Sequence, residues 1–157
     1  MDSGLRVLDA MIIRPVVATP QTSIRDVAAL MDKYCIGSVL IKEGSELLGI
    51  VTEADYVRRA VLEGHDTVST AISKIMTKDL VTVSPGVDVL DALLLMKDAD
   101  VRHLPVVDDG KLVGFVTMKD ILKIQPSLFE NIVDMMDIRE EQRKSMGKVQ
   151  GLELDED

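Results

Sequence analysis

The sequence has little of what several common functions need. It contains no tryptophan, two phenylalanines, two tyrosines, two histidines and one cysteine. A stacking platform for single-stranded nucleic acid needs more aromatic rings than these. Cys35 cannot form an internal disulfide, which favours a reducing cytoplasm, and we expect its thiol to be a small buried hydrophobe. His65 and His103 are far apart in the sequence and lack metal-ligand spacing, so we expect no metal site.

Long apolar runs and basic clusters are lacking too. No run approaches the roughly 20 apolar residues that span a bilayer, and the opening segment MDSGLRVLDAM has no apolar signal core. The formal net charge is −9, whereas nucleic acids and anionic membranes attract clustered lysine and arginine. We therefore expect neither a nucleic acid nor a membrane as the partner of this chain.

Motifs typical of catalysis are also missing. There is no Walker phosphate-binding loop and no glycine fingerprint of dinucleotide-binding folds. No serine or cysteine sits beside an identifiable base, and nothing pairs Glu53 or Glu63 for general acid–base chemistry. We predict that the protein is not an enzyme. Its 157 residues, 46% of them hydrophobic, suffice for one compact domain or two small subdomains that share a core.

The chain does contain an internal repeat. GIVTEAD occupies residues 49–55 and GFVTMKD occupies residues 114–120. A shift of 65 residues aligns the sequence with itself without a gap from Val7 to Val57. A match in one register over so long a stretch indicates two similar structural units. One such unit has too small a core to be stable alone, so we expect the two to form one pseudo-symmetric module.

Each unit is predicted to have the order β-α-β-β-α, preceded by a linking helix that ends near Met11 or Met76. Ser23 and Asp88 are the expected N-caps of the first long helices, each followed by an acid and an apolar stripe with helical spacing. The pattern predicts strands at 15–19, 36–41 and 47–52 in the first unit and at 80–84, 101–107 and 112–117 in the second, with final helices at 53–62 and 118–124.

Residues 126–150 follow the repeat and are predicted to form a C-terminal helix with an acidic tail after it. Ser127 and Glu130 fit a capping box behind Pro126. The methionine-containing apolar stripe that follows has two interpretations. We favour a helix that covers the module's own surface, because such stripes are usually core, over a helix that binds a partner.

The repeated motif also has two interpretations. In the first copy, Thr52 and Asp55 fit a capping box in which the acid also favours the helix dipole. A cap does not require Gly49 three residues before the threonine, however, and glycine in a strand often marks the close approach of another group. A helix N-terminus beside such a glycine offers N–H groups to an anion, and an aspartate can hold the vicinal hydroxyls of ribose. The combination therefore suits a nucleoside phosphate.

The segments MTKDLVTVSPGVDVLDALLLM and VRHLPVVDDGKLVGFVTMKDIL, with their counterparts in the first unit, resemble the cystathionine beta-synthase (CBS) domain family, and the pair resembles a Bateman module. The resemblance covers residues 5–124, with one repeat at 5–62 and the other at 70–124. It implies an α+β fold of two pseudo-symmetric β-α-β-β-α CBS repeats that form one Bateman module, with the C-terminal helix outside it. It also implies adenosine-containing ligands in two clefts between the repeats, and a disc-shaped homodimer.

Carried over to this sequence, the resemblance implies that the motif aspartate holds the ribose hydroxyls, that the threonine contacts ribose or phosphate, and that apolar residues flank the adenine. One cleft would be formed by Thr117, Asp120 and Phe115 with Ile13, Ile36, Gly37 and Ser38, and the other by Thr52, Asp55 and Ile50 with Thr77, Lys78, Val101 and Arg102.

The two clefts are not expected to be equivalent. Arg102 and His103 stand where the first unit has glycine and serine, and the resemblance implies that basic residues there accompany charged nucleotides. Arg102 and His103, with Lys78 or Lys119, are the candidate phosphate ligands. The alternatives are that Arg102 forms a surface salt bridge and that His103 is a hydrogen-bonded histidine of its strand. We expect the cleft with more basic residues to bind phosphate-bearing ligands more tightly.

These observations predict a regulatory sensor. AMP, ATP, S-adenosylmethionine or a related adenosyl compound would act as a regulatory ligand and not as a cofactor, and would favour one arrangement of the repeats. That shift would alter a homodimer or the contacts with an unidentified protein partner. The alternatives are a constitutive dimerisation or adaptor domain with empty clefts and, less favoured by the charge, a regulator that holds RNA. Part of the apolar faces of the two final helices is expected to be left for pairing with another chain; these faces carry Tyr56, Val57, Val61, Ile121, Leu122 and Ile124.

Overall fold

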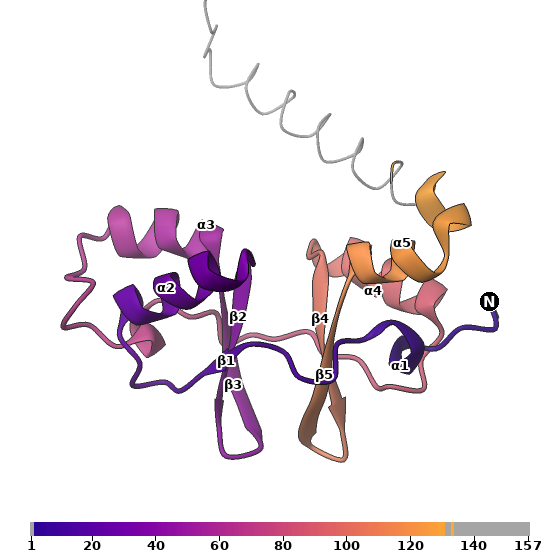
Figure 1. Ribbon diagram of the computed structural model, residues 1–157, viewed down its shortest axis with the longest axis horizontal. Coiled ribbons are helices and arrows are strands. Elements are labelled where there is room, and N and C mark those ends of the chain that lie inside the picture. The colour runs from indigo at the N-terminus through magenta and orange to yellow at the C-terminus, as the bar shows by residue number, and fades with distance from the viewer. Residues whose placement is uncertain (1, 131–132, 134–157) are drawn as a thin grey trace, which may run out of the picture.

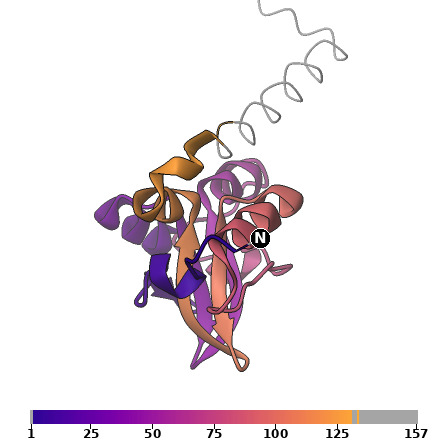
Figure 2. The same ribbon diagram turned by 90° about the vertical axis from the view of Figure 1, so that its right-hand side faces the viewer.

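The computed structural model describes residues 2–130 and 133, which form two lobes side by side (Figure 1). Each lobe contains one β-hairpin, and the two hairpins point toward the same end of the molecule. Figure 2 shows the same arrangement from the side, with most of the helices gathered toward the opposite end. Apart from its first residues, the predicted C-terminal helix and the acidic tail lie outside the described residues.

The strands confirm the predicted mixed α+β fold. In the first lobe, β1 (Val17–Ala18) runs parallel to β2 (Ser38–Glu43), which pairs antiparallel with β3 (Glu46–Thr52). In the second lobe, β4 (His103–Asp108) and β5 (Lys111–Thr117) form the equivalent antiparallel hairpin. The register of both hairpins shifts at matching places, after Ile41 and after Val106.

The strand predicted at 80–84 is wrong. In that segment Val83 alone pairs with β4, as a single parallel bridge to Val106. The partner strand explains the difference between the lobes. In the first lobe, Leu40 of β2 donates its N–H to the carbonyl oxygen of Val16 at 3.4 Å. The equivalent residue of β4 in the second lobe is Pro105. Proline has no N–H to donate, so one bond of the ladder is missing and the pairing does not extend.

The two long helices begin and bury their side chains as predicted. Helix α2 (Ile24–Tyr34) is capped by Ser23, whose hydroxyl accepts from an N–H of the first turn. Helix α4 (Val89–Ala99) is capped by Asp88, whose carboxylate accepts the N–H of Leu90 at 2.8 Å. The buried residues of their predicted stripes are Ile24, Val27 and Met31 in α2 and Val89, Ala92, Leu93 and Met96 in α4.

Cys35 is exposed, so the prediction of a small buried hydrophobe is wrong. It follows the last residue of α2 and has a left-handed backbone with φ of 52°. Asp100 ends α4 in the same way, with φ of 56°. A residue that terminates a helix in this conformation turns the chain at the surface. The exposure of the Cys35 thiol is therefore set by its position at the end of the helix and not by its hydrophobicity.

The helices after the motifs form, and part of their apolar faces is buried within the module. Helix α3 (Glu53–Asp55) continues into a π-helical segment, η1 (Tyr56–Val61), and α5 spans Met118–Ile124. The hydroxyl group of Tyr56 donates to the carbonyl oxygen of Ile24 at 2.6 Å, and Ile121 is fully buried. These two side chains hold their own lobes together and are not free to pair with another chain.

The helices that lead into the repeats exchange lobes. Helix α1 (Val7–Ala10) precedes the first repeat, yet Val7 is buried in the core of the second lobe and donates its N–H to Val87. Figure 1 shows α1 beside that lobe. Conversely η2, a 3₁₀ turn at Ile72–Lys74, precedes the second repeat but buries Ile72 in the core of the first lobe. The two crossing segments therefore tie the lobes into one module.

A third apolar cluster joins the lobes between these cores. It consists of Leu40 and Ile50 from the first sheet and Phe115 from the second. Beyond α5 the chain turns at η3 (Pro126–Leu128). Ser127 lies inside that turn and accepts a hydrogen bond from the side chain of Gln125, so it does not serve as the predicted N-cap.

Candidate ligand-binding clefts

Both copies of the repeated motif form the capping box that the sequence predicts. The hydroxyl group of Thr52 accepts the N–H of Asp55 at 3.4 Å, and Oδ2 of Asp55 accepts the N–H of Thr52 at 2.9 Å. Thr117 and Asp120 repeat the arrangement at 3.2 Å and 2.9 Å. One oxygen of each aspartate is therefore engaged by its own helix, and only the second oxygen is left for another partner.

The motif glycines admit backbone from the other repeat. A Cβ atom on Gly49 would lie 2.8 Å from the sulfur of Met76 and 2.9 Å from the carbonyl oxygen of Thr77. A Cβ atom on Gly114 would lie 2.7 Å from the sulfur of Met11. The groups that approach these glycines therefore belong to the two crossing segments, which cover the strand face beside each motif.

Asp55 is surrounded by partners from its own chain. Its Oδ1 accepts the hydroxyl of Thr77 at 3.3 Å and lies 3.9 Å from Nε of Arg59. The guanidinium group of Arg59 also donates to the carbonyl oxygens of Ile75 and Met76, at 3.1 and 3.0 Å. Asp55 is only 8% exposed. It therefore anchors the segment that leads into the second repeat, with both oxygens in use.

Asp120 has no such surroundings. The residues equivalent to Thr77 and Arg59 in the other half are Ile12 and Ile124, which carry no polar group. Among the described residues, Oδ1 of Asp120 accepts no hydrogen bond, and the side chain is half-buried. Asp120 therefore offers one carboxylate oxygen to a ligand without breaking an existing contact.

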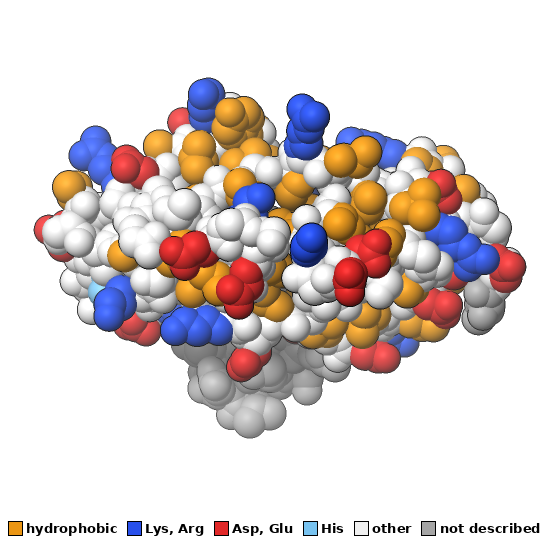
Figure 3. All heavy atoms as spheres, turned by 90° about the horizontal axis from the view of Figure 1, so that it is seen from below, with side chains coloured by type: hydrophobic (Ala, Val, Ile, Leu, Met, Phe, Trp, Pro, Cys, Tyr) orange, Lys and Arg blue, Asp and Glu red, His pale blue; other side chains and the backbone are white. Residues whose placement is uncertain are grey.

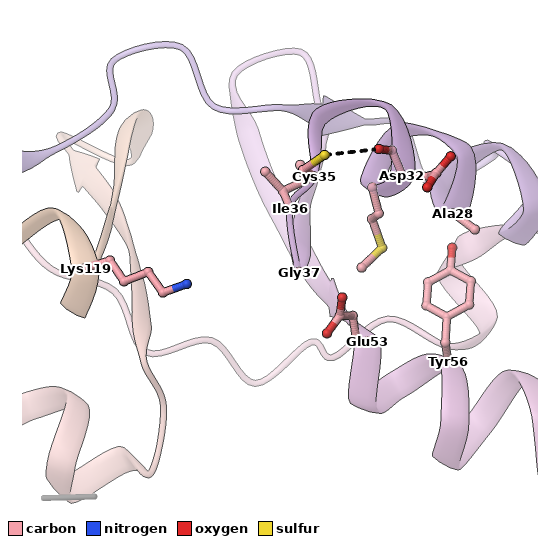
Figure 4. Close-up of a pocket in the computed structure, with 9 residues that line it drawn as sticks. Ala28, Asp32, Cys35, Ile36, Gly37, Glu53, Tyr56 and Lys119 are labelled. Atoms are coloured by element: carbon pink, nitrogen blue, oxygen red, sulfur yellow. Dashed lines mark hydrogen bonds between the residues drawn. The ribbon is translucent and has the colours of Figure 1, made fainter. Parts of the chain in front are cut away.

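The larger cleft, of about 690 Å³, lies between the lobes. Figure 4 shows its first wall, formed by the end of α2, the start of β2 and the start of α3, and Lys119 reaching toward it from α5 of the second lobe. Two predicted ligand residues, Ile36 and Gly37, lie in that wall. Burial raises the pKa of Tyr56 to about 12, so this wall residue stays a hydrogen-bond donor at neutral pH.

A smaller cleft of about 190 Å³ opens where the first crossing segment passes β5. It contains Ile13, together with Arg14 and Lys42. The residues predicted for one site are thus divided between two openings. Figure 3 shows the molecule from below, where hydrophobic side chains gather over the middle of the face and the basic side chains are scattered singly among acidic ones.

Phe115 and His103 form a stack inside the module, with ring centroids 5.7 Å apart. Phe115 is 8% exposed. Burial lowers the pKa of His103, and the negative charge of Asp55, in the motif of the other repeat, acts in the opposite direction. One face of the phenyl ring is already covered by the imidazole, so an adenine base would have to use the other face or displace His103.

The other predicted site residues are dispersed. Arg102 and Lys78 are exposed and form no ion pair with another described residue. The carbonyl oxygen of Arg102 accepts the N–H of Met118 at 3.0 Å, Ser38 pairs with Thr52 across the first hairpin, and Val101 packs against the second core. Ile50 pairs with Thr77.

Sequence reasoning missed Arg59, although its spacing of four residues from Asp55 on a helix signals an ion pair.

The described residues contain neither a membrane-spanning helix nor a cluster of metal ligands. No helix among them combines the length and the apolar character needed to cross a bilayer. No three acidic, histidine or cysteine side chains among them are grouped as metal ligands would be.

Comparison with known proteins decides the family. The sequence model of the CBS domain matches residues 7–62 and 72–127, which include both copies of the motif. The chain belongs to the CBS domain family.

Individual relatives agree with this assignment. Protein MK0525 of Methanopyrus kandleri is 38% identical over 123 residues, which are 77% of this chain and 63% of that relative. A CBS-domain protein from Burkholderia ambifaria has a TM-score of 0.69 and 31% identity, over 76% of this chain and 91% of that one. The CBS domain pair of protein MJ0100, solved with 5′-methylthioadenosine and S-adenosyl-L-methionine, has a TM-score of 0.68 and 29% identity, over 76% of this chain and 98% of that one.

Partial matches to enzymes concern this module alone. The inosine-5′-monophosphate dehydrogenase of Staphylococcus haemolyticus is 36% identical over 120 residues, but these are only 23% of that enzyme. The CBS pair and its solved relatives support a ligand-binding regulatory module.

Proposed function

We propose that this CBS pair senses an adenosyl ligand, which it binds in the larger cleft at the amino end of α5. The observation that carries the proposal is the cleft itself, about 690 Å³ in volume and bounded by both lobes. Ligand pockets for molecules of nucleoside size commonly have volumes of 300–1,000 Å³. The MJ0100 pair, which is similar in fold and sequence, was solved with two adenosyl compounds.

Asp120 is the proposed ribose ligand. Its Oδ1 is unengaged among the described residues, and it stands next to Lys119, which lines the cleft. Ile36 and Gly37, which line the opposite wall, are the proposed contacts to the base. We do not expect the Asp55 cleft to bind more tightly, although it has more basic residues, because a ligand there would have to displace Thr77 or Arg59.

Signalling would follow from the position of the cleft between the lobes. A ligand that contacts both favours one relative arrangement of them. The exposed apolar residues of η1 and the residue after it are Val57, Val61 and Leu62, exposed by 61%, 72% and 76%. We propose that these residues pair with a second copy of the chain, so that ligand binding in the cytoplasm alters the homodimer or the protein bound to it.

A constitutive dimerisation domain is the second candidate. The complete capping boxes favour it, because they explain both threonines and both aspartates without any ligand.

Isothermal titration calorimetry of the purified chain against AMP, ATP and S-adenosylmethionine tests the proposal. We expect saturable binding of at least one compound with one site per chain. Asp120→Asn should abolish it, while Asp55→Asn should leave the affinity within about threefold, which is less than 1 kcal/mol. Thermal unfolding of both variants checks that they fold. If none of the compounds binds, the dimerisation domain is the better explanation.

A further inference from the structure

Two opposite charges face each other across the larger cleft. Lys119 extends into it from α5 of the second lobe, and Glu53 extends into it from α3 of the first (Figure 4). Both residues are exposed. Neither side chain makes a hydrogen bond or an ion pair with another described residue. The lysine and the glutamate are thus too far apart to neutralise each other, and both are available to a molecule between them.

This pair of charges is found on one side of the pseudo-symmetric module alone. The residue equivalent to Glu53 in the second repeat is Met118, and the residue equivalent to Lys119 in the first is Ala54. Capping and folding of the two helices therefore do not require the charges, because α3 and α5 form equivalent capping boxes without a matching pair.

The charges of the cleft disfavour a polyphosphate. Two carboxylate side chains, Asp32 and Glu53, line it together with a single cation, Lys119. Several phosphate charges would meet one ammonium group and two groups of like charge, which costs affinity. A ligand that carries one carboxylate and one ammonium group matches the cleft better, because each of its charges finds an opposite charge on a different lobe.

We propose that the ligand of this cleft is a zwitterionic adenosyl amino acid, whose α-carboxylate binds Lys119 and whose α-ammonium group binds Glu53. This inference rests on the adenosyl-binding function proposed above and specifies its ligand. The amino-acid group would bridge the lobes, with the glutamate from one repeat and the lysine from the other. A nucleoside without that group would occupy the same space but leave both charges unpaired.

Calorimetry with three probes tests the inference: S-adenosylhomocysteine, whose only charges are the α-carboxylate and the α-ammonium group, 5′-methylthioadenosine, which lacks the amino-acid group, and ATP. We expect S-adenosylhomocysteine to bind the wild type on the order of tenfold more tightly than either other probe, the usual value of a charge-assisted hydrogen bond. Glu53→Gln and Lys119→Gln should each weaken S-adenosylhomocysteine about tenfold and leave 5′-methylthioadenosine within about twofold. Glu53→Lys should shift the preference toward ATP.

Two matched variants control for the loss of charge elsewhere. Glu46→Gln removes an exposed acid at the start of β3, and Lys123→Gln removes an exposed base one turn further along α5. Both should bind all probes like the wild type. Equal affinity for S-adenosylhomocysteine and 5′-methylthioadenosine, or tighter binding of ATP, would overturn this inference and leave the sensor function intact. If these three probes, AMP and S-adenosylmethionine all fail to bind, the sensor function and this inference are overturned together.

Discussion

The hydroxyl group of Thr77 donates a 3.3 Å hydrogen bond to Oδ1 of Asp55. Ile12, its equivalent in the other half of the molecule, has no hydroxyl group to donate to Asp120. This difference separates two motifs that are otherwise alike. In the first repeat the aspartate holds the crossing segment, and in the second it keeps one oxygen available.

Thr77→Val should therefore weaken folding and leave ligand binding nearly unchanged. The substitution keeps the shape of the side chain but removes the donor to a buried carboxylate, which we expect to cost about 1–2 kcal/mol. Urea denaturation measures the free energy of unfolding. Thr82→Val is the control. Thr82 is exposed and lies between η2 and α4, so this substitution should cost less than about 0.5 kcal/mol. Equal costs for the two variants would show that the hydrogen bond does not anchor the segment.

Gly114→Ala should destabilise the module by about 1–3 kcal/mol, the usual cost of overpacking. The sulfur of Met11 can move aside, but the carbonyl oxygen of Ile12, 3.0 Å from the added Cβ, belongs to the backbone. Gly49→Ala meets the same obstacle at Thr77 and should have a similar effect.

Gly86→Ala provides the matched control for both glycine substitutions. Its added Cβ would meet no atom within 4 Å, so the thermal midpoint should not fall. A comparable loss of stability in all three variants would point to a general effect of replacing glycine rather than to the close approach of the crossing segments.

The stability of the module should fall as the pH drops below about 6.5, the ordinary pKa of histidine. Burial lowers the pKa of His103 in the folded state, so the unfolded chain takes up its proton at a higher pH than the folded chain does. The contribution is fully present above the unfolded pKa and is lost as the pH falls toward the folded pKa. Thermal unfolding at pH 7.5 and pH 5.5 checks this. His103→Gln should show a smaller difference between the two; an unchanged difference would assign the effect to other groups.

Cys35 should react with a thiol reagent in the native state, because it is exposed at the rim of the larger cleft. As the chain has one cysteine, one equivalent of thiol should be consumed without denaturant. A ligand in the cleft should slow the reaction. If the occupied state is fully protected, the rate should fall about tenfold when the free ligand concentration is ten times its dissociation constant. Cys35→Ser gives the background rate. Unchanged labelling at saturating ligand would place the ligand elsewhere.

Local patterns in the sequence predicted the helices and both capping boxes well. Ser23, Asp88 and the two Thr-x-x-Asp motifs act within one turn of the chain, where spacing alone fixes the geometry. Pro105 could have warned against a strand at 80–84, since a proline cannot complete the ladder.

The site was harder to predict because it depends on contacts between distant segments. The pattern around Gly114 indicates a close approach but not that Met11 makes it. Likewise, the sequence presents Asp55 and Asp120 as equals, and only the packing of Thr77 and Arg59 around the first separates them. The position of Glu53 opposite Lys119 across the cleft depends on the relative placement of the lobes, which no local pattern contains.

The exchange of lead helices also dictates an order of events during synthesis. The core of the first lobe needs Ile72 and Ile75, so the first repeat cannot finish folding as its last strand leaves the ribosome. Val7, made before either β-hairpin, must wait for α4 and β5 before it has a core to enter. Domains usually fold as units from the N-terminus during translation. Here the earliest and the latest parts of the module reach their native state together, and each repeat produced alone would lack a buried helix of its core.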